Sequence, residues 1–243
     1  MNQNTQNAQS AESAENVYRR DFIVWLSSAA AVVCPMPAWA QKSQTAPTAK
    51  TGSKPAATTQ TILVLGDSLS AEYGLARGAG WVALLEKRLQ AEKIAATVVN
   101  ASVSGDTTSG GRSRLGALLA LHQPSVVVIE LGGNDALRGL PLKNTEENLS
   151  AMVQAAQKTG AKVLLIGMQL PPNYGSDYAS RFVHIFDSVA QKNKTALVPF
   201  LLKGIADKID AMALFQPDRI HPLAQAHPQM LDNVWPALRK LLR

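Results

Sequence analysis

The sequence predicts a three-layer α/β domain, in which helices cover both faces of a parallel β-sheet. From Thr61 onward, short apolar runs rich in β-branched residues alternate with longer amphipathic stretches, as strands alternate with helices. Residues 126–131 and 163–166 are apolar along nearly their whole length, which is typical of strands that are buried on both faces. The chain has 243 residues, of which 46% are apolar, enough for one hydrophobic core rather than two.

The expected elements follow one another in regular alternation. Strands are expected at residues 62–65, 97–99, 125–131, 162–168 and 195–198. Helices are expected at residues 81–94, 112–121, 145–158, 177–192 and 223–242. Asn144, followed three residues later by Glu147, resembles a capping box that starts the third helix, and Gly160 is a plausible stop for it. In such sheets functional groups collect in the loops just beyond the carboxyl ends of the strands.

Residues 1–40 have the pattern of an export signal. Arg19 and Arg20 precede an Ala-rich, charge-free stretch at residues 24–33, and residues 38–40 read Ala-Trp-Ala, a small-x-small cleavage pattern. Paired arginines before a mildly hydrophobic stretch resemble the twin-arginine export signal. We therefore expect a periplasmic or secreted protein, with the twin-arginine export machinery as a partner.

Other interpretations of this leader are less favoured. The uncharged residues 22–40 include two prolines, and their clean apolar part is shorter than the roughly 20 residues of a spanning helix. Lipid attachment at Cys34 is disfavoured because Val33 stands where that signal has a small residue. Residues 41–60 consist of small, polar and proline residues and are expected to form a flexible linker. Residues 61–243 are then the single folded domain, without stable membrane insertion after signal cleavage.

The charge and cysteine content exclude several classes of function. The sequence pI is about 9.5 and the formal net charge is +6, but the basic residues are scattered rather than gathered in a run or stripe. This distribution is typical of a solvated surface and argues against a nucleic-acid partner. A single cysteine excludes an internal disulfide and a cysteine-rich metal site.

A serine directly follows the first expected strand. Residues 66–70 read Gly-Asp-Ser-Leu-Ser, so Ser68 opens a loop or helical turn above the sheet. A serine after a strand is often only a helix cap. As a nucleophile, its hydroxyl is weak at neutral pH and needs a positioned base. The other loops decide between these two roles.

Three later loops carry the groups that a nucleophilic serine needs. Gly105 follows the second strand and Asn134 the third, and each is by itself an ordinary turn residue. Together, the backbone amides of Ser68 and Gly105 and the side-chain amide of Asn134 are donors of the kind found in an oxyanion hole. Asp218 stands three residues before His221, so one loop can supply a base and the carboxylate that orients it. The remaining histidines have no accompanying motif and are interpreted as structural: His122, His184 and His227.

These four loops resemble the sequence blocks of the SGNH, or GDSL, hydrolase family. The blocks are Gly-Asp-Ser-Leu-Ser, Ser-Gly-Asp, Gly-Gly-Asn-Asp and Asp-x-x-His, and the resemblance spans residues 62–242. Within the family, residues 100–107, 130–135 and 170–175 are similar to the bacterial periplasmic multifunctional thioesterases, arylesterases and lysophospholipases. The resemblance implies the SGNH hydrolase fold, with five parallel strands in a flavodoxin-like order.

The resemblance also implies a role for each site residue. Ser68 is the nucleophile, His221 the general base and later the general acid, and Asp218 the carboxylate that orients the histidine. Ser68, Gly105 and Asn134 are the oxyanion donors. The reaction implied is hydrolysis of a small-molecule acyl ester or thioester through an acyl-enzyme intermediate, with no metal or organic cofactor.

Two alternatives stay open from the sequence alone. A carbohydrate O-acetyl esterase has the same four blocks, although a sugar site would more typically offer exposed aromatics, and aromatics are only 5% of the chain. Residues 170–175 instead resemble the mobile loop that borders the acyl chain in the thioesterase group. A non-catalytic flavodoxin-like binding module is the second alternative, but it has no need of a nucleophile, a base and three oxyanion donors together.

Overall fold

The computed structural model describes residues 59–242. The predictions of a signal peptide at residues 1–40 and of a linker up to residue 58 lie outside the described residues. The first strand begins at Gln60, the last residue of the expected linker. Among residues 59–242, no helix has both the length and the apolar character needed to cross a membrane.

The elements alternate as the sequence predicts. The strands are β1 (Gln60–Gly66), β2 (Ala96–Asn100), β3 (Val126–Glu130), β4 (Lys162–Ile166) and β5 (Ala196–Val198). The α-helices are α1 (Trp81–Ala91), α2 (Thr108–His122), α3 (Gly133–Leu137), α4 (Leu142–Lys158), α5 (Ser176–Lys192) and α6 (His227–Leu241). Short 3₁₀ helices lie at η1 (Pro172–Tyr174), η2 (Ala211–Leu214) and η3 (Ala224–Ala226).

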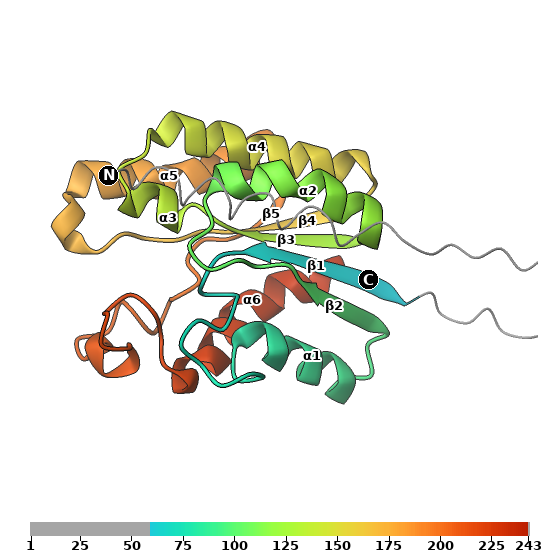
Figure 1. The fold of residues 1–243 in the computed structure, drawn as a ribbon, viewed down its shortest axis with the longest axis horizontal. Coiled ribbons are helices and arrows are strands. Elements are labelled where there is room, and N and C mark those ends of the chain that lie inside the picture. Colours follow the sequence, from blue (N-terminus) through green and yellow to red (C-terminus); the bar gives the residue numbers. More distant parts are fainter. Residues whose placement is uncertain (1–58, 243) are drawn as a thin grey trace, which may run out of the picture. The chain divides into compact units, whose positions relative to one another are not determined.

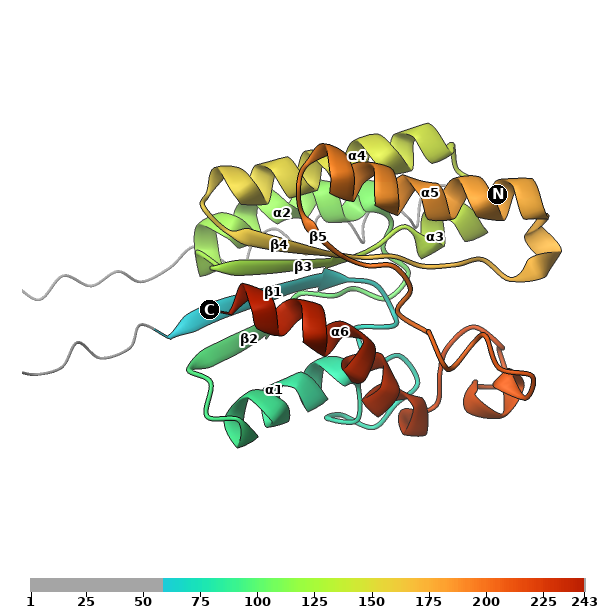
Figure 2. The same ribbon diagram turned by 180° about the vertical axis from the view of Figure 1, so that it is seen from behind.

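The five strands form one parallel sheet in the order β2-β1-β3-β4-β5. This is the flavodoxin-like order, so the predicted fold class is confirmed. Helices α1 and α6 cover one face of the sheet, and α2, α3, α4 and α5 lie on the other (Figures 1 and 2). The three layers enclose two apolar clusters. Ile62 and Val64 of β1 belong to the cluster under α1 and α6, whereas Leu63 and Leu65 belong to the opposite one, as the two-residue period of a strand requires.

Helices α2 and α4 start earlier than predicted. Helix α2 begins at Thr108 because the side chain of Thr107 caps it, accepting a hydrogen bond from the Gly110 amide at 3.3 Å. The expected capping box at Asn144 is wrong. Helix α4 begins at Leu142 with Pro141 in the N-cap position and no side-chain cap, so Asn144 already lies within the first turn.

Helix ends and short elements show what the pattern could and could not predict. Gly160, with a φ of +86°, follows the end of α4 and confirms the predicted stop. The terminal helix starts at His227 rather than Leu223, because a 3₁₀ turn precedes it. The five-residue helix α3 was not predicted, since it is too short to show an amphipathic period.

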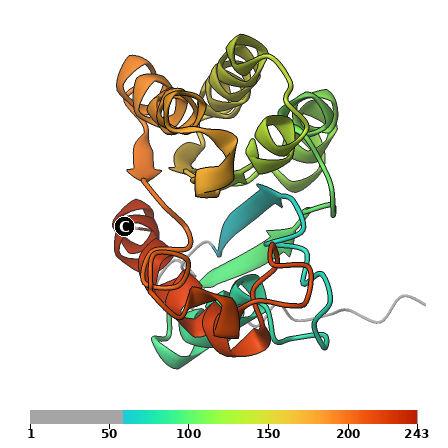
Figure 3. The same cartoon turned by 90° about the vertical axis from the view of Figure 1, so that its left-hand side faces the viewer.

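The sheet order determines where a site can form. The chain leaves β1 on its way to α1 and leaves β3 on its way to α3 and α4, and these helices lie on opposite faces (Figure 1). Neighbouring strands whose connections diverge in this way leave a crevice at their carboxyl ends. Figure 3 looks onto this end of the sheet, where the loops after the strands gather.

Candidate active site

The loops after β1, β2, β3 and β5 meet at the carboxyl end of the sheet. Ser68, two residues beyond β1, is hydrogen-bonded to His221 from the segment between β5 and α6. The loops after β2 and β3 are joined by Arg138, whose Nη2 donates to the carbonyl oxygen of Gly105 at 2.9 Å. Segments up to 153 residues apart in the sequence thus form one site.

Ser68, His221 and Asp218 form a continuous hydrogen-bonded series. The Oγ of Ser68 lies 2.8 Å from Nε2 of His221, and Nδ1 of the same ring lies 2.7 Å from Oδ2 of Asp218. The His221 side chain is 16% exposed, so that the site remains open to a ligand. A hydroxyl, an imidazole and a carboxylate in this order can move a proton from the serine to the ring while the carboxylate stabilises the resulting imidazolium.

A tight turn holds Asp218 in its ionised form. Its Oδ1 accepts hydrogen bonds from the backbone N–H groups of Ile220, at 2.9 Å, and His221, at 3.0 Å. Arg219, between them, has a φ of +61°, in the left-handed region that turn residues adopt. Partial burial raises the pKa of Asp218, but these N–H donors and the imidazole outweigh it and lower the pKa to about 2. Asp218 therefore carries a full negative charge at neutral pH.

Tyr73 packs against the imidazole of His221. The two ring centroids are 4.4 Å apart and the planes are inclined by 40°. The Tyr73 side chain is half exposed, and its carbonyl oxygen accepts a hydrogen bond from Nε2 of Gln216 at 2.9 Å. Tyr73 thus restricts the imidazole at the rim of the site. The sequence alone does not indicate this contact, because Tyr73 lies far from His221 along the chain.

Asn134 lies in the first turn of α3, where Gly132 with a φ of +119° lets the chain leave β3 sharply. Its Nδ2 donates one hydrogen bond to Oδ2 of Asp67, at 3.1 Å. A side-chain amide nitrogen carries two N–H groups, so the second remains for another acceptor. Asp67 therefore fixes the amide of Asn134 beside the nucleophile loop.

The backbone amides of Ser68 and Gly105 have no hydrogen-bond acceptor among residues 59–242. Gly105 has a φ of +76°, which side-chain-bearing residues rarely adopt, and this conformation turns the loop after β2. Two amides without an internal acceptor and one anchored side-chain amide are chemically suited to bind an oxygen that gains negative charge.

Charged residues support the loops that carry Gly105 and Asn134. Asp106 accepts a hydrogen bond from Nε of Arg114 at 2.9 Å, and Arg114 also donates to the carbonyl oxygen of Ala101. Asp135 is buried and accepts from both the backbone amide and the hydroxyl of Thr108, at 2.8 and 2.5 Å. These contacts fix both loops to α2. Among the described residues, histidines, cysteines and carboxylates do not gather in a group that could hold a metal ion.

His227 is buried behind the site. Its Nδ1 accepts a hydrogen bond from the backbone amide of Trp81 at 3.0 Å, and burial lowers the pKa of the imidazole. This histidine links the start of α1 to the start of α6, which agrees with its interpretation as structural.

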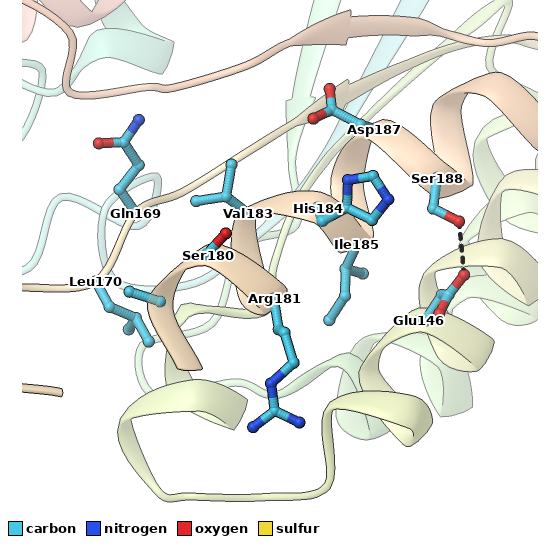
Figure 4. Close-up of a pocket in the computed structure, with 11 residues that line it drawn as sticks. Glu146, Gln169, Leu170, Ser180, Arg181, Val183, His184, Ile185, Asp187 and Ser188 are labelled. Carbon is cyan, nitrogen blue, oxygen red and sulfur yellow. Dashed lines mark hydrogen bonds between the residues drawn. The ribbon is translucent and has the colours of Figure 1, made fainter. Parts of the chain in front are cut away.

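A surface hollow of about 790 Å³ lies along α5, apart from the four loops. Figure 4 shows His184, Arg181 and Asp187 of α5 around it, with Leu170 from the segment after β4 at one end. Its wall toward α4 includes Glu146, which accepts a hydrogen bond from Ser188 at 2.8 Å. The lining includes none of the predicted site residues, so the hollow is not the place of the chemistry.

Comparison with protein families and known sequences gives a consistent result. Residues 64–228 match the model of the GDSL-like Lipase/Acylhydrolase family. The chain is 53% identical over 186 residues to Esterase TesA of Pseudomonas aeruginosa, which covers 76% of this chain and 91% of the relative. It is 41% identical over 187 residues to Thioesterase 1/protease 1/lysophospholipase L1 of Escherichia coli strain K12, covering 77% and 87%.

Comparison of structures agrees with these matches. The crystal structure of TesA superimposes with a TM-score of 0.72 at 53% identity, covering 75% of this chain and 99% of that one. The similarity therefore extends over nearly the whole length of each relative. The residues matched by the family model, 64–228, include the four loops that form the site.

Proposed function

Because the chain belongs to the GDSL-like lipase/acylhydrolase family, we propose that it hydrolyses carboxylic esters and thioesters, with Ser68 as the nucleophile. The observation that carries this proposal is the hydrogen-bonded series from Ser68 Oγ through His221 to Asp218, at 2.8 and 2.7 Å. Such a series activates a hydroxyl that is otherwise a weak nucleophile. Relatives described as an esterase and as a thioesterase and lysophospholipase support acyl esters and thioesters as the substrates.

The proposed reaction has two stages. In the first, Ser68 Oγ attacks the substrate carbonyl, His221 takes the serine proton, and the carbonyl oxygen becomes negative. The amides of Ser68, Gly105 and Asn134 donate hydrogen bonds to that oxygen. The tetrahedral intermediate then expels the alcohol or thiol, which receives its proton from His221, and an acyl-serine remains. In the second stage His221 takes a proton from water, the resulting nucleophile attacks the acyl group, and Ser68 regains its proton as the acid leaves.

The direct test is Ser68→Ala, assayed on p-nitrophenyl esters from acetyl to palmitoyl beside an acyl-CoA, a lysophospholipid and an acetylated xylo-oligosaccharide. We expect turnover to fall by ~10⁴-fold or more, as loss of a nucleophile does in related catalytic triads. Ser109→Ala, an exposed serine in the first turn of α2, is the matched control. Retention of a tenth of wild-type activity in Ser68→Ala would exclude the assignment. Activity confined to the acetylated sugar would favour a carbohydrate esterase.

We further propose that the protein is exported through the twin-arginine route to the periplasm or the medium. The support is the pair Arg19 and Arg20 before the apolar residues 24–33, with a small-x-small sequence at residues 38–40. A precursor carrying both Arg19→Lys and Arg20→Lys should accumulate in the cytoplasm, as should the wild-type precursor in a strain without the twin-arginine translocase. Undiminished export in that strain would show that another pathway carries the protein.

A further inference from the structure

Two carboxyl groups are buried together beneath the nucleophile loop. Asp67 and Glu130 are each only 3% exposed. Glu130 is the last residue of β3 and pairs in register with Gly66 of β1, so that Asp67 follows immediately beside it. The backbone amide of Asp67 lies 3.4 Å from Oε2 of Glu130. Among residues 59–242, no lysine, arginine or histidine forms an ion pair with either carboxyl group.

Both oxygens of Asp67 accept hydrogen bonds from N–H groups. Oδ1 accepts from the backbone amide of Leu69 at 3.0 Å, and Oδ2 accepts from Nδ2 of Asn134 at 3.1 Å. Carboxylates attract such donors more strongly than neutral acids do. Of the nearby charged groups, the imidazole of His221 favours a negative Asp67, whereas Asp106 opposes it.

Glu130 has a different environment. Its Oε2 accepts from the hydroxyl of Ser70 at 2.8 Å, and the Ser70 oxygen in turn accepts from Nε1 of Trp81 at 3.2 Å. The space around Oε2 is full, because a Cβ added to Gly66 would lie 2.9 Å from it and 2.8 Å from Ser70. Glu130 is therefore enclosed by neutral groups, with Asp67 as its charged neighbour.

The pair cannot hold two negative charges at neutral pH. Burial raises the pKa of Asp67 to about 6. Burial, followed by the negative charge of Asp67, raises the pKa of Glu130 well above its ordinary value. Adjacent carboxyl groups in a water-poor site share one proton for this reason.

We propose that Glu130 is a neutral carboxylic acid, that Asp67 is the carboxylate of the pair, and that Asp67 is a positioning residue for the oxyanion donor Asn134. This inference rests on the proposed function. Asp67 holds one N–H of the Asn134 amide, so that the other N–H is directed at the substrate carbonyl oxygen. Because Glu130 is neutral, the negative charge of the pair stays on Asp67. Among residues 59–242 no cation pairs with Asp67, so none competes with Asn134 for its oxygens.

The first experiment is a double-mutant cycle with Asp67→Asn, Asn134→Ala and the combined variant. Asp67→Asn has the shape of the native side chain but offers one acceptor oxygen to two donors, so the Asn134 amide loses its fixed orientation. We expect kcat to fall about 10- to 100-fold with KM nearly unchanged, less than the loss of the donor itself. On the Asn134→Ala background, Asp67→Asn should lower kcat by no more than about threefold further, since Asp67 acts through Asn134. A full additional loss on that background would overturn the positioning role.

The second experiment tests the neutral state of Glu130 without relying on activity. Glu130→Gln retains a neutral group of the same shape, so we expect normal folding and a kcat within about threefold of wild type. The infrared carbonyl band of a protonated carboxylic acid should be present at neutral pH in the wild type and absent from Glu130→Gln. A large loss of kcat, or the absence of that band in the wild type, would overturn the proposal. If Asp67→Asn does not fold, the infrared and kinetic measurements on Glu130→Gln still test the proposal.

The two experiments separate failure of this proposal from failure of the proposed function. If the wild type hydrolyses no ester or thioester, and Ser68 is not labelled by a fluorophosphonate, the proposed function fails. The infrared band still tests whether Glu130 is protonated. If the wild type is active and Ser68 is labelled, additive effects of Asp67→Asn and Asn134→Ala on kcat overturn the positioning role of Asp67 but not the proposed function. Asp232→Asn, which removes an exposed carboxylate paired with Arg88 on the surface, is the control for a changed charge.

Discussion

Asp218 is hydrogen-bonded to His221 and Asp67 directly precedes Ser68, but the two carboxylates differ in exposure and in the origin of their hydrogen bonds. The Asp218 side chain is 36% exposed and accepts three hydrogen bonds, all from its own turn, whereas Asp67 is 3% exposed and accepts from two separate loops. The pKa of Asp218 is lowered to about 2, because local N–H donors outweigh partial burial. That of Asp67 is raised to about 6, because burial outweighs its donors.

This difference teaches how one site assigns two tasks to the same side chain. A carboxylate that stabilises an imidazolium must be fully ionised. An exposed turn with several N–H donors stabilises the ionised form at little cost in desolvation. A carboxylate that orients a neutral amide needs a fixed location rather than a low pKa, and burial beside two strands fixes its location.

The largest expected effect is that of Asp218→Asn. The substitution removes the negative charge and lets His221 adopt the wrong tautomer, so we expect kcat to fall by ~10³- to 10⁴-fold. Because Asp218 is exposed and bonded within its own turn, the melting temperature should change little. Steady-state kinetics paired with a thermal melt measure both. Asp210→Asn, an exposed aspartate of the same segment, is the control, and a kcat of Asp218→Asn within tenfold of wild type would contradict the role.

Asn134→Ala tests the group that Asp67 holds. If Asn134 donates to the substrate oxygen as proposed, that hydrogen bond is made mainly in the transition state, so kcat should fall ~10²- to 10³-fold while KM rises little. An asparagine that serves only as a turn residue would give the opposite result. Its loss would then cost about 1 kcal/mol of stability and leave turnover per folded molecule nearly unchanged. A lowered melting point with kcat within about threefold of wild type would therefore exclude the oxyanion role.

Gly66→Ala tests the packing around the buried carboxyl groups of Asp67 and Glu130. The added Cβ would lie 2.8 Å from Ser70 and 2.9 Å from Oε2 of Glu130, closer than such contacts allow. We expect a loss of about 1 to 3 kcal/mol in the free energy of unfolding, measured in urea, together with a lower kcat as the carboxyl pair shifts. Gly116→Ala is the matched control. Gly116 is an exposed residue of α2 with nothing near its Cβ position, and the substitution should stabilise the protein by about 0.5 to 1 kcal/mol.

The fold was predictable because its signals are local. Alternating apolar runs give the five strands, and residues of β1, β3 and β4 are buried as continuous apolar strands require. Helix α3 was missed because it is too short to show an amphipathic period. The starts of α2 and α4 were missed because a threonine cap and a proline, rather than apolar periodicity, set them. Packing between elements also acts at Gly111, where an added Cβ would lie 2.3 Å from Cδ1 of Leu131.

For the site, the sequence predicted which residues come together but not what holds them. The motifs contain Ser68, Asn134 and His221, and the structure brings their loops together at the carboxyl end of the sheet. Asp67 and Glu130 lie within the same motifs, yet only the register of β1 with β3 brings the backbone of Asp67 to the carboxyl group of Glu130. The packing of Tyr73 on the imidazole is equally a property of the folded chain.

The last prediction contrasts the pH dependence of stability at the two carboxyl groups. The folded-state pKa of Asp67 is raised, so its contribution to stability is present below pH ~4 and is lost as pH rises through about 6. His221, Asp106 and Glu130 are the titratable groups that face Asp67. Because Glu130 titrates with it, the clean comparison is Glu130→Gln against the same variant carrying Asp67→Asn.

From pH 4 to pH 7 the single variant should lose on the order of 2 kcal/mol relative to the double variant, by urea unfolding. The contribution of Asp218 to stability depends on pH with the opposite sign. Its pKa is lowered, so its stabilising contribution is present above pH ~4 and declines as pH falls toward 2. Wild type should therefore lose stability relative to Asp218→Asn as pH falls from about 5 to 3, and by less, because Asp218 is exposed. Equal slopes of the same sign at the two positions would mean that burial does not distinguish these carboxyl groups.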